Sequence, residues 1–203
     1  MARFIDQVII GLNEQQLINE LKSGSQQAFA LIVEEYQEKV LNTCLGFVPD
    51  LQESEDLVQE VFIQVYQSIS GFKGESSFST WLYRIAVSKS LEHIRFKKRK
   101  KRASFFQSLI GLEGAIDTVS SDQFDHPGVK LENKEKTKIL FNQIDKLSKN
   151  QRIAFVLHKV EGLSHKEVAE IMDVTVGAVE SLLHRAKQNL RKQLKGYYQQ
   201  QML

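Results

Sequence analysis

Polar side chains that could contact nucleic acid recur on one face of the segment VGAVESLLHRAK, residues 176–187. In it, Val179, Leu183 and Ala186 follow an i, i+4, i+7 spacing, which predicts a helix with one apolar face. Hydroxyl, carboxylate, imidazole and guanidinium groups can bind base edges or phosphates. Such groups lie on the opposite face of the helix. That face consists of Gly177, Glu180, Ser181, His184, Arg185 and Gln188, and Lys187 is a nearby cation.

The residues before this segment predict that it is the second helix of a helix-turn-helix. Ser164 and Glu167 have the spacing of a capping box at the start of a first helix. Asp173 stands in the turn where Gly is usual, and Thr175 can cap the second helix. The second helix of this motif enters the major groove of DNA. A helical hairpin without DNA contacts shares the pattern and stays open as the alternative.

A second candidate for nucleic-acid contact is a helix predicted from about Thr80 onward. Bases stack on aromatic rings while cations follow the phosphates, so this composition suits single-stranded nucleic acid. Alternatively, the rings of Phe78 and Trp81 belong to the core, and the basic run is a solvated helix end. The side chains concerned are Phe78, Trp81, Tyr83 and Arg84, followed by the run RFKKRKKR at 95–102, which includes Arg95, Lys97, Lys98 and Arg99.

An acidic face is predicted on the helix over 52–69. Its apolar positions form a core face: Leu57, Val58, Val61, Phe62, Val65 and Ile69. The other face carries Asp56, Gln59, Glu60, Ile63 and Gln67. An apolar side chain with a polar rim is typical of the anchor of a protein interface, although single exposed apolar residues are also common.

Composition limits the class of protein. A chain of 203 residues with 2 Pro, 11 Gly and almost no alternating apolar pattern is predicted to be all-α. The single cysteine, Cys44, excludes a disulfide within the chain and a Cys-rich zinc site, and it is expected to be buried and inert. Neither a signal peptide nor a membrane span is predicted, so we expect a cytoplasmic protein. Without HExxH or clustered carboxylates, we expect no catalysis, no cofactor and no metal, which argues against a nuclease.

Breaks in composition predict two helical domains joined by a flexible linker. The first domain is predicted at 1–102. The linker at 103–134 is rich in Ser, Asp and Gly and has no sustained helical period. The second domain, 135–203, contains the helix-turn-helix.

Taken together, these segments resemble the bacterial RNA polymerase sigma factors of the extracytoplasmic-function (ECF) group of the sigma-70 family. SEDLVQEVFIQVYQSISGFKGESSFSTWLYRIAVSKSLEHIR is similar to region 2 of that family. LSKNQRIAFVLHKVEGLSHKEVAEIMDVTVGAVESLLHRAKQNLRKQL is similar to its region 4. The motifs occur in the right order and at the right spacing, with a linker between them.

The resemblance implies a role for each matched position. Asp56, Gln59, Glu60 and Ile63 match the helix that docks on the β′ clamp of core polymerase. Phe78, Trp81, Tyr83 and Arg84 match the stretch that helps to open the minus-ten element. The helix that follows, Ser88 to Arg95, matches the segment that reads flipped bases there. The second helix of the helix-turn-helix, with Thr175 at its start, matches the reader of the minus-thirty-five element.

The chain departs from the common family pattern at several of these positions. Ser88 stands where Asn is usual, and Glu92 stands where Asp or Asn is usual. Glu180 and Leu182 replace residues that are often basic. Glu180 can accept a hydrogen bond from cytosine, or it can be a solvated side chain.

The partners implied are core RNA polymerase and promoter DNA, both duplex and single-stranded. The resemblance also allows an anti-sigma factor as a partner. The competing hypothesis is a helix-turn-helix regulator that binds duplex DNA independently of polymerase and carries a sensory N-terminal domain. The acidic face and the Trp/Arg/Lys segment favour the sigma factor.

Overall fold

The computed structural model describes residues 13–109 and 139–201, and every regular element in those ranges is a helix. This confirms the predicted all-α fold. In chain order the elements are α2 (Glu14–Lys22), α3 (Gln26–Phe47), α4 (Leu51–Ser68), the short η1 (Ile69–Gly71), α5 (Phe78–Leu109), a helical stretch at 139–145, α7 (Lys149–Phe155), the π-helical turn η2 (Val156–Val160), α8 (His165–Met172) and α9 (Val176–Gln201).

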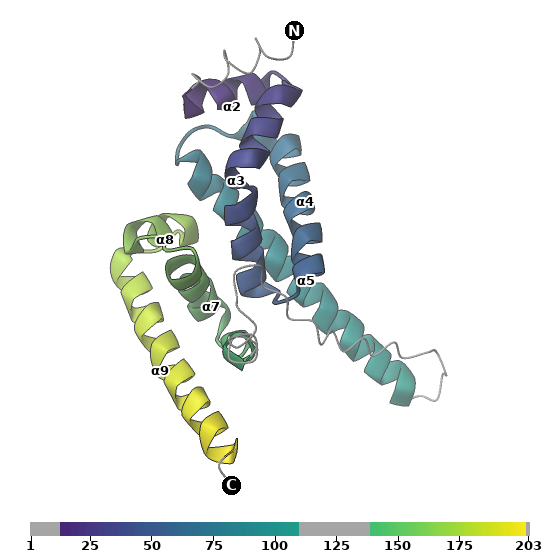
Figure 1. The fold of residues 1–203 in the computed structure, drawn as a ribbon, viewed down its shortest axis with the longest axis vertical. Helices are drawn as coiled ribbons and strands as arrows, with labels where there is room; N and C mark the ends of the chain where they lie inside the picture. Colours follow the sequence, from purple (N-terminus) through teal and green to yellow (C-terminus); the bar gives the residue numbers. More distant parts are fainter. Residues whose placement is uncertain (1–12, 110–138, 202–203) are drawn as a thin grey trace.

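The N-terminal half is a bundle in which α3, α4 and α5 pack on one another and α2 lies across one end (Figure 1). Asp50 caps the start of α4, and its carboxylate accepts from the Glu53 amide at 2.9 Å. The predicted core face of α4 is confirmed. Leu57, Val61 and Val65 are at most 1% exposed.

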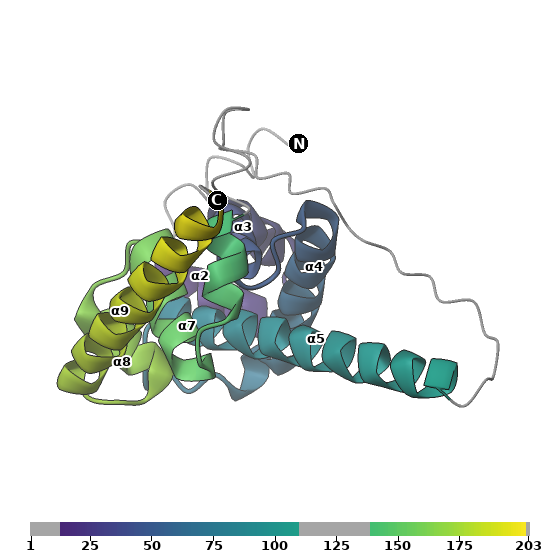
Figure 2. The ribbon, with the colours of Figure 1, turned by 90° about the horizontal axis from the view of Figure 1, so that it is seen from below.

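Helix α5 is longer than its predicted counterpart. It continues from Phe78 past Arg102 to Leu109 and projects beyond the bundle (Figure 2). The first seven residues of the predicted linker, 103–109, are therefore helical. They contain neither Gly nor Pro, so nothing in them ends a helix; the first such residue is Gly111. The predicted linker from residue 110 onward lies outside the described residues.

The helix-turn-helix is built as predicted from α8 and α9. Ser164 and Glu167 form a capping box, with the Ser164 amide 2.8 Å from the Glu167 carboxylate. Asp173 ends α8 in the left-handed conformation, with φ at 55°. Thr175 accepts from the Ala178 amide at 3.2 Å and so caps α9. A non-Gly residue in the left-handed region costs little when it is Asp, which explains why this turn tolerates the absence of Gly.

The two halves share one continuous apolar core. Helix α3 contacts η2, and α5 contacts α8, so buried side chains from both halves meet along a seam. Val156 and Leu157 of η2 and Cys44 of α3 are fully buried there. Among the described residues, no helix is both long and apolar enough to cross a membrane.

Candidate functional site

The acidic face of α4 is open to solvent. Asp56, Gln59 and Glu60 are exposed, and the Ile63 side chain is 55% exposed. Lys89 of α5 lies 3.7 Å from the Glu60 carboxylate, the one ion pair that these four residues form in the described part of the chain. Helix α4 lies on the side of the bundle away from α8 and α9 (Figures 1 and 2). A partner could therefore reach all four residues.

Sequence reasoning missed a second apolar residue on this helix. Tyr66 is 47% exposed and lies three residues after Ile63, so the two side chains neighbour each other on the helix surface. Its ring rests edge-on against Phe29, with 5.3 Å between ring centroids. The spacing of three residues between Ile63 and Tyr66 was the feature of the sequence that could have revealed this second apolar residue. Together the two residues widen the apolar part of the face.

The aromatic residues at the start of α5 lie in an aromatic cluster. The Phe78 ring is 2% exposed and packs against the rings of Tyr36, Phe72 and Trp81. The Trp81 ring is partly buried, with its centroid 5.1 Å from that of Phe72. In this conformation Phe78 belongs to the core, and Trp81 offers only part of its ring to a base.

Tyr83 and Arg84 both contact the C-terminal half. The Tyr83 side chain is 6% exposed, and its hydroxyl lies 3.5 Å from the Glu161 carboxylate, which follows η2. The Arg84 guanidinium donates to the carbonyl oxygens of Glu170 at 2.6 Å and of Ile171 at 3.3 Å. Both candidate DNA contacts are thus engaged within the protein.

Glu161 is an acidic residue that sequence reasoning did not single out. One of its carboxyl oxygens, Oε1, is buried without a hydrogen-bond partner. Burial raises the pKa of Glu161 to about 7, and the nearby hydroxyls of Thr43 and Tyr83 only partly oppose that effect. Burial and Glu161 in turn raise the pKa of Tyr83 above its usual range.

The middle of α5 presents the residues predicted to read the minus-ten bases. Ser88, Glu92 and Arg95 are all exposed. The Ser88 hydroxyl lies 3.5 Å from the Glu92 carboxylate one turn later, and Arg95 Nε donates to the Leu91 carbonyl at 3.2 Å. These three side chains therefore share one accessible stretch of helix.

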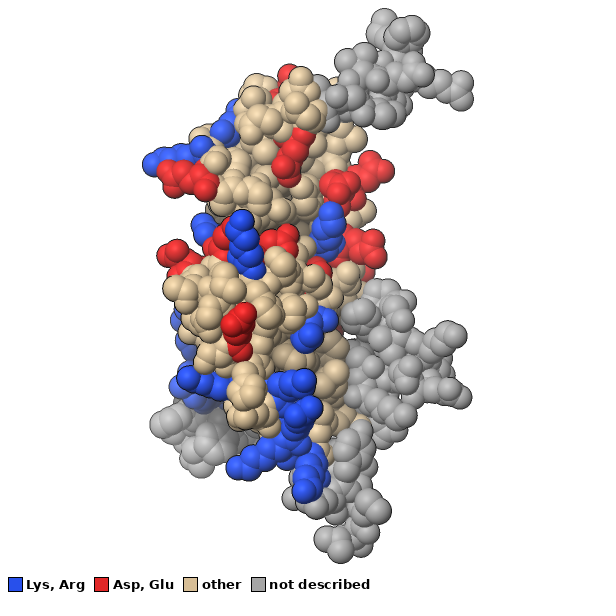
Figure 3. Space-filling view, turned by 90° about the vertical axis from the view of Figure 1, so that its left-hand side faces the viewer, with Lys and Arg blue, Asp and Glu red and all other residues tan. Residues whose placement is uncertain are grey.

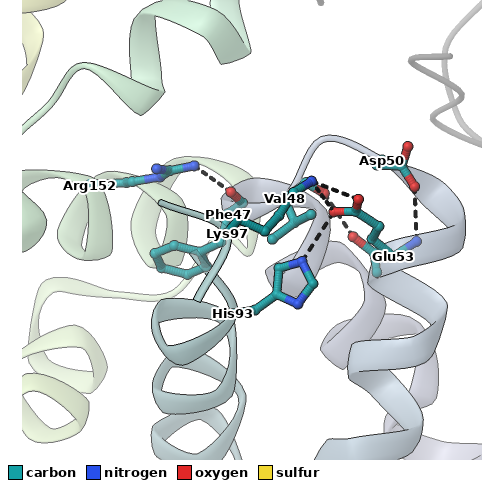
Figure 4. Close-up of polar contacts among 8 residues, drawn as sticks. Phe47, Val48, Asp50, Glu53, His93, Lys97 and Arg152 are labelled. Carbon is teal, nitrogen blue, oxygen red and sulfur yellow. Dashed lines mark hydrogen bonds and ion pairs between the residues drawn. The ribbon is translucent and has the colours of Figure 1, made fainter. Parts of the chain in front are cut away.

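The basic end of α5 is partly neutralised from α4. Lys97 Nζ lies 2.6 and 2.7 Å from the two carboxylate oxygens of Glu53, and His93 Nε2 lies 3.1 Å from one of them (Figure 4). Burial raises the pKa of Glu53, but the hydrogen bonds from Lys97 and His93 outweigh it and hold that pKa below its usual value. Lys98 and Arg99 are exposed and carry no such carboxylate contact among the described residues.

Helix α9, the second helix of the helix-turn-helix, turns its predicted polar face outward. Val179 and Ala186 are fully buried, whereas Thr175, Gly177, Glu180, His184, Arg185 and Lys187 are exposed and Ser181 is half-buried. Glu180 lies 3.6 Å from His165 at the start of α8, and His184 lies 2.8 Å from Gln188. Arg185 and Lys187 have no carboxylate partner within the described structure.

Exposed cations continue along α9 beyond the predicted site. Lys and Arg side chains gather at the lower end of the face shown in Figure 3, on the side where α9 lies. Arg191, Lys192 and Lys195 of α9 are exposed, after Arg185 and Lys187. Sequence reasoning missed these three, although their spacing along a helix was visible.

Neither a metal cluster nor a reactive thiol is found in the part of the chain that the structure describes. No group of three or more His, Cys, Asp or Glu side chains there could hold a metal ion. Cys44 is fully buried, and burial raises the pKa of its thiol to about 12. The prediction of a buried, inert Cys44 is confirmed.

Two family models match the chain. "Sigma-70 region 2" matches residues 32–100, which run from within α3 into the basic end of α5. "Sigma-70, region 4" matches residues 138–190, which include the helix-turn-helix.

Similar proteins are found at both the sequence and the structure level. The ECF RNA polymerase sigma-E factor of Escherichia coli K12 is 33% identical over 186 residues, 87% of this chain and 92% of that protein. The RNA polymerase sigma-H factor of Pseudomonas aeruginosa is 32% identical over 188 residues, 89% and 93% of the two chains. The fold is similar to that of CnrH in complex with the cytosolic domain of CnrY, with a TM-score of 0.64 at 21% identity over 89% and 96% of the chains.

Proposed function

The chain belongs to the ECF RNA polymerase sigma factors of the sigma-70 family, and we propose that it engages core polymerase and the promoter through three separate surfaces. As a sigma factor it binds core polymerase and directs promoter recognition and transcription initiation. The α4 face of Asp56, Gln59, Glu60 and Ile63 is the proposed docking surface for the polymerase. The α5 segment from Phe78 to Arg99 and the α9 face from Thr175 to Lys187 are the proposed DNA contacts.

The observation that carries this assignment is the exposed acidic α4 face with Ile63 at its centre. The match of residues 32–100 to the region 2 model disfavours a regulator that acts independently of polymerase. We propose no catalysis by the chain itself, and we place it with the polymerase in the cytoplasm. An anti-sigma factor is a further proposed partner, since the similar RpoE of Bartonella quintana was solved with the anti-sigma factor NepR.

The experiment that tests the function is transcription in vitro from a pool of genomic fragments. Purified core polymerase with this protein is expected to start at a discrete set of promoters that share two sequence elements. Core polymerase alone is the control. If the protein adds no specific start sites, although it is folded and present in excess, the assignment is wrong.

Replacing Trp81 by Ala is expected to slow open-complex formation about 5- to 150-fold. Stacking of one base on an aromatic ring is worth about 1–3 kcal/mol, and the exposed part of the ring is available for it. Stopped-flow fluorescence on a promoter labelled in the minus-ten element measures the rate.

A pre-melted promoter bubble separates this defect from a packing defect. The Trp81 ring also packs on Phe72 and Phe78, so truncation removes core contacts. Transcription from the bubble template is expected to return to the wild-type level. A folded variant that the bubble does not rescue would contradict a role in strand opening.

Glu180 and Arg185, both exposed on α9, are expected to differ in what they contribute to upstream binding. If Glu180 accepts from a cytosine, Glu180→Ala changes the preference at one base pair by about 1–3 kcal/mol. Arg185→Ala is expected to weaken binding of all sequences alike and to lower the salt slope by about one, because its charge is free to meet a phosphate. Selection from randomised upstream elements by the wild type and both variants measures this. Identical motifs for wild type and Glu180→Ala would exclude base reading by Glu180.

A further inference from the structure

Phe96 on α5 is the most exposed large apolar side chain in the part of the chain that the structure describes. It is 58% exposed and lies within the basic run at 95–102. Unlike Tyr66, whose ring rests against Phe29, it contacts no other aromatic ring among the described residues. A single exposed ring is common on protein surfaces, so its neighbours on the helix decide what it can do.

Phe96 continues a row of side chains that faces away from the bundle. Residues four apart form a ridge along one side of a helix. The exposed residues Ser88, Glu92, Phe96 and Lys100 have this spacing on α5. Lys97 lies on a different side, since it pairs with Glu53 of α4. The ring of Phe96 therefore shares a ridge with two residues proposed to read the minus-ten bases.

The charges around Phe96 favour a polyanionic partner. Exposed cations precede and follow the ring, and they pair with no carboxylate in the described part of the chain, in contrast to Lys97. These cations are Arg95, Lys98, Arg99 and Lys100. Helix α5 projects beyond the bundle here, so a long partner can lie against it (Figure 2). Duplex DNA offers such a surface, because phosphates border a major groove into which the methyl groups of thymine project.

The order of proposed contacts along α5 places Phe96 on the duplex side of the minus-ten element. Strand opening is proposed for Trp81 near the start of α5, and base reading begins at Ser88. Phe96 lies eight residues beyond Ser88, or about 12 Å along the helix, on the side away from Trp81. That length corresponds to about three or four base-pair steps. Phe96 thus lies away from the melted end of the element, where the bases are still paired.

We propose that Phe96 is a further specificity-determining residue, whose ring contacts the C5-methyl group of a thymine in the duplex beside the minus-ten element. Apolar side chains can recognise thymine in this way, and cytosine offers an amino group in place of the methyl-bearing edge. Arg95, Arg99 and Lys100 hold the phosphates on either side of the ring. This inference rests on the proposed function of α5 in reading the minus-ten element.

Selection from randomised promoters tests whether Phe96 reads sequence. The template is a promoter at which core polymerase with the full chain starts transcription in vitro, and it is randomised in the duplex beside the minus-ten element. The wild type is expected to enrich thymine at one position there. Phe96→Ala is expected to lose that enrichment and to keep the preferences within the minus-ten and minus-thirty-five elements.

Replacing the selected thymine by deoxyuridine tests the methyl contact itself. The exchange removes one methyl group and keeps the charge and all hydrogen-bonding groups of the base. Burial of one such group corresponds to about a fourfold change in affinity. The wild type with core polymerase is therefore expected to bind the deoxyuridine promoter about fourfold more weakly, and Phe96→Ala to bind both promoters equally. Fluorescence anisotropy of the labelled promoters measures this, and equal binding of both by the wild type would overturn the proposal.

Two further variants separate the methyl contact from other roles of this stretch. Phe96→Leu is expected to keep a preference for thymine, because a methyl contact needs apolar surface and no ring. Complete loss in Phe96→Leu would indicate stacking on an unpaired base and would overturn the proposal. Lys100→Ala, on the same ridge, is expected to weaken binding of all promoters alike and to lower the salt slope by about one, whereas Phe96→Ala leaves that slope unchanged.

The folded state is expected to be the same in all these variants. Phe96 is exposed and Ala is a good helix former, so helicity by circular dichroism is expected to stay at the wild-type level. If the wild type adds no specific start sites, the proposed function fails and this inference fails with it. If start sites are specific and Phe96→Ala selects the same flanking duplex as the wild type, only this inference is wrong. Binding of the free chain to phosphatidylglycerol vesicles that Phe96→Ala abolishes, with promoter selection unchanged, would assign the ring to a membrane surface instead.

Discussion

Reversing the charge of Asp56 and Glu60 to Lys is expected to weaken binding to core polymerase roughly 100-fold, or about 3 kcal/mol. Both carboxylates are exposed on the α4 face that also carries Ile63, so a basic partner would meet two like charges in place of two opposite ones. The only ion pair lost within the described structure is the exposed contact of Glu60 with Lys89, which contributes little to stability. Fluorescence anisotropy of the labelled protein with purified core polymerase measures the affinity.

A matched pair on α3 controls for net charge. Glu34→Lys with Glu38→Lys has the same four-residue spacing, the same change in charge and equally exposed side chains. That variant is expected to keep its affinity, and both variants are expected to keep wild-type helicity by circular dichroism. Equal loss of binding in the two variants would point to a long-range charge effect and would remove the case for a docking face on α4.

Replacing Glu161 by Gln is expected to stabilise the protein by about 3 kcal/mol at pH 8 and hardly at all at pH 4.5. The pKa of Glu161 is about 7 in the folded protein, raised by burial from an ordinary value of 4.5. Below pH 4.5 the carboxyl is protonated in both folded and unfolded chains, so it costs nothing. Between pH 4.5 and 7 the Glu161 carboxyl is ionised in the unfolded chain but protonated in the folded protein, so the free energy of unfolding falls as the pH rises. This loss of stability is complete above pH 7.

Thermal unfolding, followed by circular dichroism between pH 4.5 and 8, tests the direction of this change in stability with pH. Gln has the shape of protonated Glu and no proton to lose, so the variant is expected to show a flatter pH dependence. Glu34→Gln, the same exchange on an exposed part of α3, is the control. A Glu161→Gln variant less stable than the wild type at pH 8 would mean that the ionised carboxylate is well paired in the folded state.

The basic end of α5 shows that the charge of a segment can be read from the sequence, whereas the contacts that its side chains make cannot. The run at 95–102 was visible as a block of cations, and most of it is exposed in the structure. Glu53 was visible only as one acid among others on α4. Its pairing with His93 and Lys97, which lie 40 and 44 residues further along the chain, depends on how α4 packs against α5.

The local features were determined by the sequence itself. The capping box of Ser164 and Glu167, the left-handed Asp173 and the cap at Thr175 each depend on residues within four positions of one another. The faces of α4 and α9 follow from the period of a helix, which sorts side chains without reference to the rest of the chain. The motifs and their order along the chain were enough to identify the family, because each motif is a short stretch of consecutive residues.

What only the tertiary structure decided is the seam between the halves. Arg84 contacts a carbonyl 86 residues away, Arg152 contacts one 105 residues away, and Tyr83 meets Glu161 at a separation of 78 residues. No periodicity relates such positions, and burial of Glu161 arises only once η2 packs on α3 and Tyr83 of α5 lies against Glu161. The sequence thus determined which surfaces the protein possesses, and the packing of the two halves decided which of those surfaces are free, because contact across a seam depends on the relative placement of whole helices.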